Sequence, residues 1–532
     1  MQKIFRRTLT ALLIVSCILT AAIVGATVKL YTATGEDYAN EIESQDIAKL
    51  RARDKAIKNA TKEAGVYLKT YSRSIDTELT DDEVIAITSN AWQLVGEPKY
   101  TRTLKQISDN TTIVLWTATV EVNVDDSEIQ SWIKRDDKNK SQIISQTNEA
   151  LKASEENDKK IEDLREKYNR TKSATEKRRL RKQMNDADRD FLANQKLEEG
   201  NKLAYTKNYN GAIKFYSESI KLIPNGEGGY YNRGTVYNHL GQNEKAIQDL
   251  NKAIQLNPNY ANAYNNRGIT YYDLKQYERA IQDYNKAIQL NPNLFQAYGN
   301  RGIAYSALGQ YKKAIQDCNK AIQLNPIYAE AYYNRGWIYD NLGQYELAIQ
   351  DYEKAISLNP NDANAYYNRG SIYRHLNQNE RAIQDLDKAI QFNPNDSEAY
   401  TMRGNAYNSL NQCERAIQDY DKAIQLNAND SMVYYNRGIA YFKQQQYELA
   451  IQDYDKAIQI NPSYTSAYNN RGIAYACIGN FEKAIEDTTK AIKLNTNQIT
   501  AYVIRGTCYQ QLGEEEKAQA EFAKANELEY NG

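Results

Sequence analysis

Arginine and an acid recur together at a fixed spacing, and they are the first residues whose chemistry needs an explanation. The dipeptide Arg-Gly returns with a 34-residue period, at 233, 267, 301, 335, 369, 403, 437, 471 and 505, and an acid follows each arginine at one constant distance. The pattern includes Arg267 with Asp283, Arg301 with Asp317, and Arg335 with Asp351. Opposite charges at a constant separation predict one structural ion pair for each of these nine arginines. Ligand binding by the arginines is the alternative.

A row of asparagines stands directly before the arginines. Its members are Asn232, Asn266, Asn300, Asn334, Asn368, Asn436 and Asn470, and Glu198, Met402 and Ile504 break it. Tyrosine precedes four of them, as Tyr231, Tyr333, Tyr367 and Tyr435. Because an amide both donates and accepts hydrogen bonds, such a row could hold an extended peptide backbone. These residues form the predicted peptide-binding groove. The alternative is that asparagine stands here for reasons of helix surface.

Residues for catalysis are missing from the pattern. The two histidines, His239 and His375, lie in distant copies of the repeat, and the cysteines lack metal-ligand spacing. Each cysteine of the repeats occupies a different position of the 34-residue unit, which favours buried thiols over nucleophiles. The sequence therefore predicts no enzyme, no metal and no cofactor. Export from the cytoplasm would leave open a disulfide between Cys477 and Cys508.

The 34-residue unit reads as two helices that pack closely. In the unit at 261–294, Gly268 and Ala280 are small where the two helices would cross, and large rings would fill the space beside them. Pro292 would end the second helix. Ten units of this length cover residues 193–532. Stacked hairpins of this kind make a continuous core that no unit has alone.

This unit resembles the tetratricopeptide repeat. The resemblance is carried by Tyr264, Gly268, Tyr271, Ala280, Ala287 and Pro292, at unit positions 4, 8, 11, 20, 27 and 32. It implies a mainly α fold, a right-handed α-solenoid of ten helical hairpins. It also implies that positions 2, 5, 6, 9, 12 and 13 of the first helix line a concave groove that binds proteins or extended peptides.

Two further observations concern what the repeats would bind and where the array of repeats would end. The asparagine row resembles the asparagine ladder of the O-linked glucosamine transferase repeats, whereas the lysines that clamp chaperone carboxyl termini are missing at positions 2 and 5. Isoleucine stands at positions 21 and 28 of units one to nine, and Gln519 and Asn526 replace it in unit ten. A stripe that turns polar predicts that the array ends there by design.

Residues 1–26 predict a signal peptide or membrane anchor. Three basic residues precede a run of uncharged ones, at 8–28, which is the pattern of exported chains. Three fates stay open: cleavage after Ala26, retention of 8–28 as an anchor, and lipidation at Cys17. Each predicts a protein of the bacterial periplasm or cell envelope that touches the membrane only through this segment.

Residues 27–126 predict a small α/β domain in the order β-α-β-α-β-β. Alternation predicts strands at 28–38, 66–75, 100–107 and 111–124, and helices at 42–64 and after the capping box at 80–83. With "RARDKAIKNATKEAGVYL" (51–68) and "LTDDEV" (79–84), this region resembles the small domain of flagellar assembly protein T and of LPP20-type envelope lipoproteins. The resemblance implies an envelope location.

Residues 127–192 predict a charged helical connector of two helices, because a second capping box stands at 173–176. Its basic run at 177–182 is interpreted as a solvated helix face, with contact to anionic lipid as the alternative.

The whole chain has 67 Lys and Arg and 68 Asp and Glu, a net charge of −1 that argues against binding to nucleic acid. The prediction is a non-catalytic interaction scaffold of the cell envelope. Alternatives are a binder or chaperone of extended polypeptides and a regulatory subunit of an envelope enzyme.

Overall fold

The computed structural model describes residues 28–39, 45–74, 79–91, 93–95, 97–108, 111–125 and 137–531. The predicted export segment, with its cleavage site and Cys17, lies outside them. The chain divides into two compact units, Met1–Gly309 and Gln310–Gly532, and each is described by itself. In the described part of the chain, no helix combines the length and apolar character that crossing a membrane requires.

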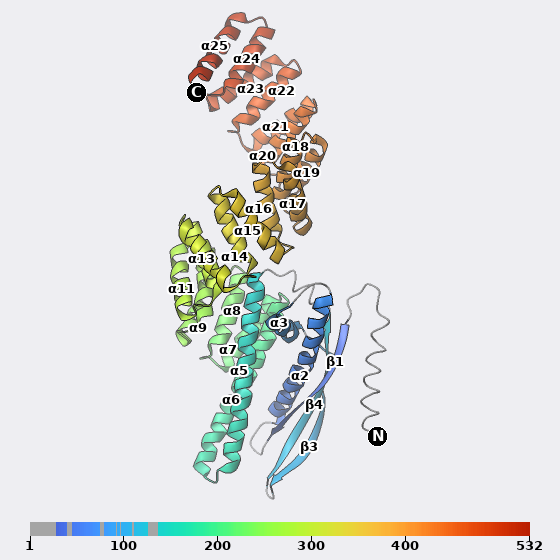
Figure 1. Cartoon of the computed structure of the whole chain (residues 1–532), viewed down its shortest axis with the longest axis vertical. Helices are drawn as coiled ribbons and strands as arrows, with labels where there is room; N and C mark the ends of the chain where they lie inside the picture. Colours follow the sequence, from blue (N-terminus) through green and yellow to red (C-terminus); the bar gives the residue numbers. More distant parts are fainter. Residues whose placement is uncertain are drawn as a thin grey trace. The chain divides into compact units, whose positions relative to one another are not determined.

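The N-terminal region of the first unit is built on a four-stranded antiparallel sheet (Figure 1). Strand β1 (Val28–Ala39) pairs along its whole length with β4 (Thr111–Asp125). The opposite edge of β4 pairs with β3 (Lys99–Ser108) and with the short β2 (Gln93–Leu94). Alternate residues of β4 are buried, as the period-2 pattern predicts. Only β2 was not expected from the sequence.

Helix α2 (Gln45–Ser74) covers one face of this sheet. Its alanines at 52, 56 and 60 are fully buried against Ala118, Val120 and Val122 of β4. The strand predicted at 66–75 is wrong, because residues 66–74 continue α2. Gly65 does not end the helix: one glycine costs only about 1 kcal/mol in a helix, and neither proline nor a turn motif accompanies it. The observed order is therefore β-α-α-β-β-β.

The predicted capping box at 80–83 is confirmed, whereas only the serine half of the one at 173–176 forms, because Glu176 binds Arg179 and the Ser173 N–H donates to Thr171 Oγ1. Thr80 and Glu83 exchange bonds at the start of α3 (Asp81–Ala91), where Glu83 N donates to Thr80 Oγ1 over 3.2 Å and Thr80 N donates to Glu83 Oε2 over 2.9 Å. Ser173 caps the connector's second helix by accepting from Glu176 N over 3.3 Å. The caps explain why helices begin at these points.

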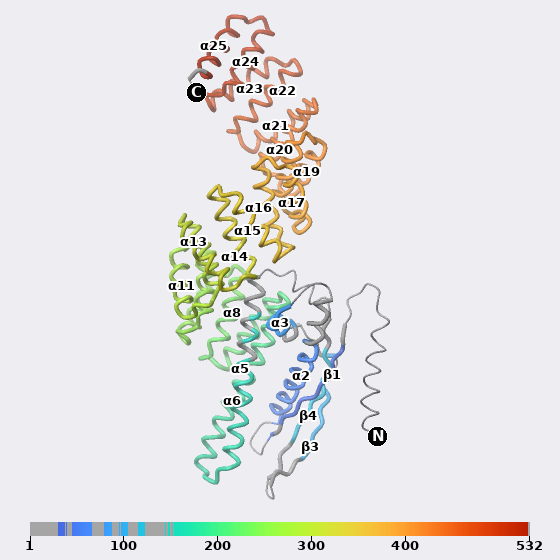
Figure 2. Tube along the Cα trace, in the orientation of Figure 1, coloured from blue at the N-terminus to red at the C-terminus, as the bar shows by residue number. Residues whose placement is uncertain are grey.

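The connector is a pair of long helices that lie side by side (Figure 2). These are α5 (Asp137–Arg170) and α6 (Ala174–Tyr205), and they bury Ile161, Leu164, Leu180 and Met184 between them. Helix α6 runs without a break through residue 193, where the first predicted unit begins. The first repeat is therefore continuous with the connector.

From α6 onward the chain forms ten successive pairs of helices, two to each 34-residue unit, and the fourth pair, α12 and α13, is divided between the two compact units. In order they are α6 with α7 (Tyr209–Leu222), α8 (Glu227–His239) with α9 (Asn243–Leu256), α10 (Ala261–Asp273) with α11 (Tyr277–Leu290), α12 (Phe295–Ala307) with α13 (Tyr311–Leu324), α14 (Ala329–Asn341) with α15 (Tyr345–Leu358), α16 (Ala363–His375) with α17 (Asn379–Phe392), α18 (Ser397–Ser409) with α19 (Cys413–Leu426), α20 (Ser431–Lys443) with α21 (Tyr447–Ile460), α22 (Thr465–Cys477) with α23 (Phe481–Leu494), and α24 (Ile499–Gln511) with α25 (Glu515–Asn531). The predicted mainly α fold of tandem hairpins is confirmed.

The turn inside each hairpin uses a left-handed residue. Gly309 and Gly343 have φ of 70° and 69°, and Asn377 has φ of 58°, residue types that commonly adopt this conformation at the end of a helix. Lys275 and Gln445 take the same conformation, which their residue types do not indicate. In α25, Gln519 and Asn526 are exposed, whereas the unit-nine isoleucine at the second position, Ile492, is buried.

Candidate functional site

The recurring arginines bind the acids of their own hairpins. Arg267 Nε lies 2.7 Å from Asp283 Oδ2, and its Nη2 lies 2.6 Å from Asp283 Oδ1. The same contact recurs in Arg233 with Asp249, Arg335 with Asp351, Arg369 with Asp385, Arg403 with Asp419, Arg437 with Asp453, and Arg471 with Asp487, and Arg505 binds Glu521. The aspartates are buried. These are the pairs that the spacing predicts, and Arg301 with Asp317, which lie in different units, stay a prediction.

Eight of the nine arginines, all except Arg369, also reach the preceding hairpin, which sequence reasoning missed. Arg267 Nη1 donates to Asn251 Oδ1 over 2.6 Å, and Arg437 Nη1 donates to Asp421 Oδ1 over 2.5 Å. Equivalent bonds join Arg233 to Ser217, Arg301 to Asn285, Arg335 to Asn319, Arg403 to Asp387, Arg471 to Asp455 and Arg505 to Thr489. The sequence feature that could have indicated these bonds is a polar residue at one constant distance before each arginine. The guanidinium therefore holds two successive hairpins in register.

Tyrosine rings lie on both sides of these guanidinium groups. Arg267 Cζ is 5.4 Å from the ring centre of Tyr264 and 5.9 Å from that of Tyr271. The arrangement returns at Arg233, Arg301, Arg369 and Arg437. These two rings were expected to fill the space beside Gly268. They lie against the arginine instead, a favourable contact for a partly desolvated cation, and the three atoms that a Cβ on Gly268 would meet first all belong to Tyr284.

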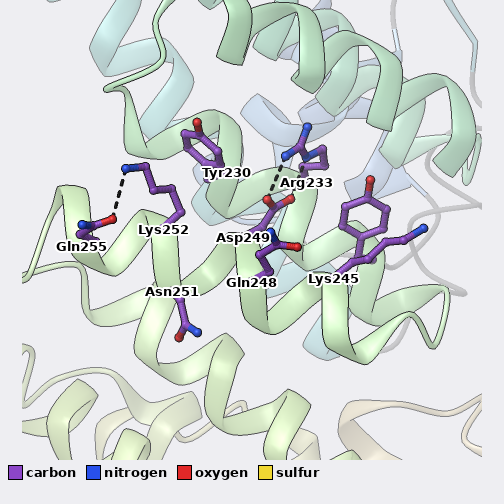
Figure 3. A pocket seen from close by; sticks show the side chains of 9 residues that line it. Tyr230, Arg233, Lys245, Gln248, Asp249, Asn251, Lys252 and Gln255 are labelled. Carbon is purple, nitrogen blue, oxygen red and sulfur yellow. Dashed lines mark hydrogen bonds and ion pairs between the residues drawn. The ribbon is translucent and has the colours of Figure 1, made fainter.

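A surface cavity of about 720 Å³ lies over one such arginine, between α8 and α9 (Figure 3). Figure 3 shows Arg233 bound to Asp249, and Lys252 bound to Gln255. Lys245 donates to Gln242 and lies 5.3 Å from the ring centre of Tyr237. Each cation that lines this cavity already binds another side chain, so we assign these residues a structural role.

The asparagine row is used mainly between hairpins. Asn300 Nδ2 donates to Asn265 Oδ1 over 3.0 Å, and Asn368 Nδ2 donates to the hydroxyl of Tyr333 over 3.1 Å. Similar bonds to the preceding hairpin are made by Asn232, Asn266, Asn436 and Asn470. Asn334 differs: its buried Nδ2 has no hydrogen-bond partner among the described residues. The row therefore helps to hold neighbouring hairpins together.

The four tyrosines of the predicted groove are mostly covered. Tyr231 is buried, and Tyr333, Tyr367 and Tyr435 are half-buried. The hydroxyls of Tyr333 and Tyr435 accept a bond from the asparagine of the next hairpin. Burial raises the pKa of Tyr367 to about 12. Little of these rings is left as open apolar surface.

A second cavity, of about 490 Å³, lies where the connector meets the first two repeats. Its walls include Leu197 of α6, Ile220 of α7 and Asn232 of α8, so one predicted groove residue does line a hollow. Lys152 and Glu156 of α5 add a wall that the repeat pattern does not show. We call this hollow the first-repeat cavity.

Glycine makes room for the first-repeat cavity. Residues 226–229 read Gly-Glu-Gly-Gly, and all three glycines line it. A Cβ on Gly228 would meet only Leu197 Cδ1, at 3.5 Å, so this position opens into the hollow. The three glycines were the sequence feature that could have indicated this cavity. The wall from the connector could not be predicted, because it depends on how α5 packs against the first repeats.

The candidate nucleophiles and bases are held in structural contacts. His375 Nε2 lies 3.1 Å from the hydroxyl of Tyr345, and the His239 ring stacks on Tyr209. Burial raises the pKa of the Cys318 thiol to about 12 and that of Cys508 to about 11. Cys477 is exposed, and it is not bonded to Cys508.

No metal site emerges where the chain is described: no group of three or more His, Cys, Asp or Glu side chains is placed to hold an ion. What the repeats offer chemically is hydrogen bonding and apolar contact. Both suit the binding of another polypeptide.

Comparison with known families gives a consistent result over the repeats. Models described as "Tetratricopeptide repeat" match residues 261–294, 295–328, 329–362, 363–396, 431–464 and 465–498, and two further models of that description match 386–418 and 499–531. A model described as "TPR repeat" matches 234–275 and 404–445. No curated protein matches the chain significantly.

Solved structures of similar proteins cover parts of the repeats. The chain is 30% identical to MamA over 30% of its own length and 95% of that chain, with a TM-score of 0.30. It is 27% identical to YrrB, titled a TPR protein with an unusual peptide-binding site, over 35% and 95% of the two chains, with a TM-score of 0.32. A tetratricopeptide repeat protein from Parabacteroides merdae is 22% identical over 47% and 98%, with a TM-score of 0.38.

Proposed function

Because this chain belongs to the tetratricopeptide repeat family, we propose that it is a non-catalytic protein-interaction scaffold of the cell envelope. Its partners would be proteins or extended peptides. The observation that carries this proposal is the first-repeat cavity, which combines apolar walls at Leu197 and Ile220 with the amide of Asn232. The lining mixes such apolar residues with amides and with the charged Lys152 and Glu156, so it can contact both the side chains and the backbone of a polypeptide.

The cavity is tested by filling it. We expect Gly228→Leu to lower the affinity for a model extended polypeptide, reduced and carboxymethylated lactalbumin, by roughly tenfold, because a leucine would occupy the hollow (about 1.4 kcal/mol). The fold should be kept, since a side chain here meets almost no neighbour. Binding is measured by fluorescence anisotropy of the labelled polypeptide.

Lys214→Leu is the matched control, because Lys214 is exposed on α7 and does not line the cavity. It adds the same apolar side chain elsewhere and should leave affinity within about twofold of the parent (about 0.4 kcal/mol). Equal affinity of the Gly228→Leu variant and the parent would remove the cavity from the proposal.

The second candidate function is a binder or chaperone of extended polypeptides that uses the asparagine row. Asn334 favours it, because its buried Nδ2 alone in the row donates to no preceding hairpin among the described residues, so this amide could turn outward to a peptide without breaking such a bond. The other members donate one amide proton to a neighbouring hairpin, so they would have to bind a peptide through their remaining donors and acceptors.

Asn334 and Asn368 separate these roles. We expect Asn368→Ala to lower stability by about 1 kcal/mol, because it leaves the Tyr333 hydroxyl without its donor. Asn334→Ala should leave stability unchanged and weaken polypeptide binding severalfold. The triple variant with Asn300→Ala, Asn334→Ala and Asn368→Ala tests three members of the row together, with polypeptide binding measured by anisotropy and stability by thermal melting. If Asn334→Ala binds like the parent, the row serves only the contacts between hairpins.

The envelope location rests on the basic residues and the apolar run of the N-terminal segment. We expect the protein in the periplasmic or membrane fraction of a bacterial host. N-terminal sequencing would distinguish cleavage after Ala26 from a retained or lipidated segment. Recovery of the intact chain in the cytosol would contradict the location while leaving the scaffold role open. The alternative role, as a regulatory subunit of an envelope enzyme, needs this location and would be contradicted with it.

A further inference from the structure

Two lysines of the 720 Å³ cavity over the second hairpin keep their positive charge. Lys245 Nζ donates to Gln242 Oε1 over 2.8 Å, and Lys252 Nζ donates to Gln255 Oε1 over 3.2 Å. These acceptors are neutral amide oxygens, so the bonds fix where each ammonium group lies without neutralising it. Because an ammonium group has three donors, each lysine can still donate to a ligand.

The acid that lines this cavity is fully used by the arginine. One oxygen of Asp249 accepts from Arg233 Nε over 2.7 Å, and the other accepts from Nη2 over 2.9 Å. Such a two-bond pair is neutral as a whole. Glu244, which precedes Lys245 on α9, is not part of the lining. With three cations and one acid, the lining has a net charge of +2.

The two lysines lie on the same side of α9. They are seven residues apart, which is about two helical turns and about 10 Å along the helix axis. In the view of Figure 3 the pair of Arg233 and Asp249 lies between them. Gln248 and Asn251, which come between the lysines in the sequence, also line the cavity. The cavity therefore presents two separated cations with hydrogen-bonding amides between them.

The third hairpin has the same arrangement. Arg279 and Lys286 of α11 stand at the unit positions of the two lysines, and each donates to a glutamine of its own helix end, over 2.9 Å and 3.3 Å. Asn285 stands at the position of Asn251. Neighbouring hairpins thus offer the same pair of cations on the same face of the repeat.

An acid replaces this asparagine in the sixth, seventh and eighth hairpins. Asp387, Asp421 and Asp455 are 51% or 52% exposed, and each binds the arginine of the following hairpin. In the seventh hairpin, Asp421 adds a negative charge between Arg415 and Lys422. The excess of positive charge is therefore not a general property of the repeat.

Acidic side chains of a polypeptide fit the second-hairpin cavity. Carboxylates would accept from Lys245 and Lys252, and the amides of Gln248 and Asn251 could bond to the backbone between them. Alternate residues of an extended segment point to one side and lie about 7 Å apart. Acids two or four residues apart can therefore span the distance between the two lysines.

We infer that the second-hairpin cavity binds an acidic segment of a partner polypeptide. This inference rests on the proposed function, which makes the partner a polypeptide, and it adds the chemistry that the partner must have. Opposite charges at such a surface select the partner more than they raise the affinity. The contacts are exposed, so salt should weaken them.

Two labelled peptides test the inference on the full chain. One has glutamate at every second residue with serine between, and the other has glutamine in place of each glutamate. We expect the parent to bind the glutamate peptide roughly tenfold more tightly in low salt, with a smaller preference as salt rises. Fluorescence anisotropy measures both affinities. Equal affinities, or no binding of the glutamate peptide, would overturn the inference.

The double variant Lys245→Gln/Lys252→Gln should lose most of this preference. Its matched control is Arg415→Gln/Lys422→Gln, which removes the same charge at the same unit positions of the seventh hairpin, beside Asp421. The control should keep the affinity for the glutamate peptide within about twofold of the parent. Thermal melting confirms that both variants stay folded. Equal losses in the two variants, or none in the first, would show that the cavity does not bind the acids.

Asn251→Asp changes the charge of the cavity and keeps its shape. A carboxylate here can still accept from Arg267, as Asp421 accepts from Arg437. We therefore expect an unchanged melting temperature and a severalfold weaker affinity for the glutamate peptide. An unchanged affinity would contradict the role of charge in this cavity.

Failure of this inference can be told from failure of the first-repeat cavity. Gly228 does not line the second-hairpin cavity, so Gly228→Leu should bind the glutamate peptide like the parent. A loss confined to the lysine variant would support the inference even if Gly228→Leu left lactalbumin binding unchanged. Phosphatidylglycerol vesicles test an anionic lipid surface as the other occupant. If the lysine variant loses vesicle binding but binds the glutamate peptide like the parent, the inference is wrong.

Discussion

Replacing Gly268 by alanine is expected to destabilise the third hairpin by about 2 kcal/mol. A Cβ at this position would lie 2.6 Å from Cε1 and 2.9 Å from Cδ1 of Tyr284. The Tyr284 ring cannot retreat, because it is 1% exposed and packs in a cluster with Ile269, Ala280 and Ala304. The clash outweighs the roughly 1 kcal/mol that alanine gains over glycine in a helix.

Gly472 provides the control for this effect. It occupies the same unit position, but its Cβ would meet Thr488 Cγ2 at 3.1 Å, a contact that a small shift relieves. We expect Gly472→Ala to be neutral within about 1 kcal/mol. Because repeat arrays need not unfold in two states, hydrogen exchange of α10 and α11 or of α22 and α23 measures each local stability. Equal losses in both variants would show that ring contact is not the cause.

The comparison of Gly268 with Gly472 also shows which features the sequence could predict. The constant repeat period required a small residue at the crossing of each hairpin, and that followed from one chain alone. The partner of the glycine did not, because Tyr264, Tyr271 and Tyr284 are all large rings of suitable spacing. Only the fold reveals that two of them stack on Arg267 and one packs on Gly268.

The candidate site was less predictable, for reasons that differ between residues. The pairing of Arg267 with Asp283 followed from their constant spacing, and the first unit, which has Glu199 and Phe215 at these positions, lacks both residues. The bond to Asn251 did not follow, since asparagine is common on helix surfaces. The first-repeat cavity depends on Lys152 and Glu156, which a connector helix brings back from outside the repeat pattern.

In the α/β region, by contrast, the local sequence pattern predicted the wrong secondary structure. Val66, Tyr67 and the residues after them have strand preferences and follow Gly65, so a strand was the local expectation. Packing of Ala52, Ala56 and Ala60 on the sheet stabilises the helix before them, and nothing at Gly65 stops it. Tertiary contacts thus decided the element that local preferences had assigned otherwise.

The second large effect concerns the ion pair of the sixth hairpin. Arg369→Leu is expected to cost about 3 kcal/mol at neutral pH, because it leaves the Asp385 carboxylate buried without its two donors. Asp385→Leu should cost less, about 1–2 kcal/mol, since the Arg369 side chain is 16% exposed and can turn toward water. Thermal melting and hydrogen exchange of α16 and α17 measure both losses.

The double variant Arg369→Leu/Asp385→Leu decides what the pair is for. Two leucines would replace the buried charges with an apolar contact, so we expect the double variant to lie within about 1 kcal/mol of the parent. The two single losses would then add to far more than the double loss, which is the mark of a direct interaction. The pair would fix the register of the hairpin and add little net stability. A double loss equal to the sum of the single losses would instead mean that each residue acts alone, and the register role would have to be abandoned.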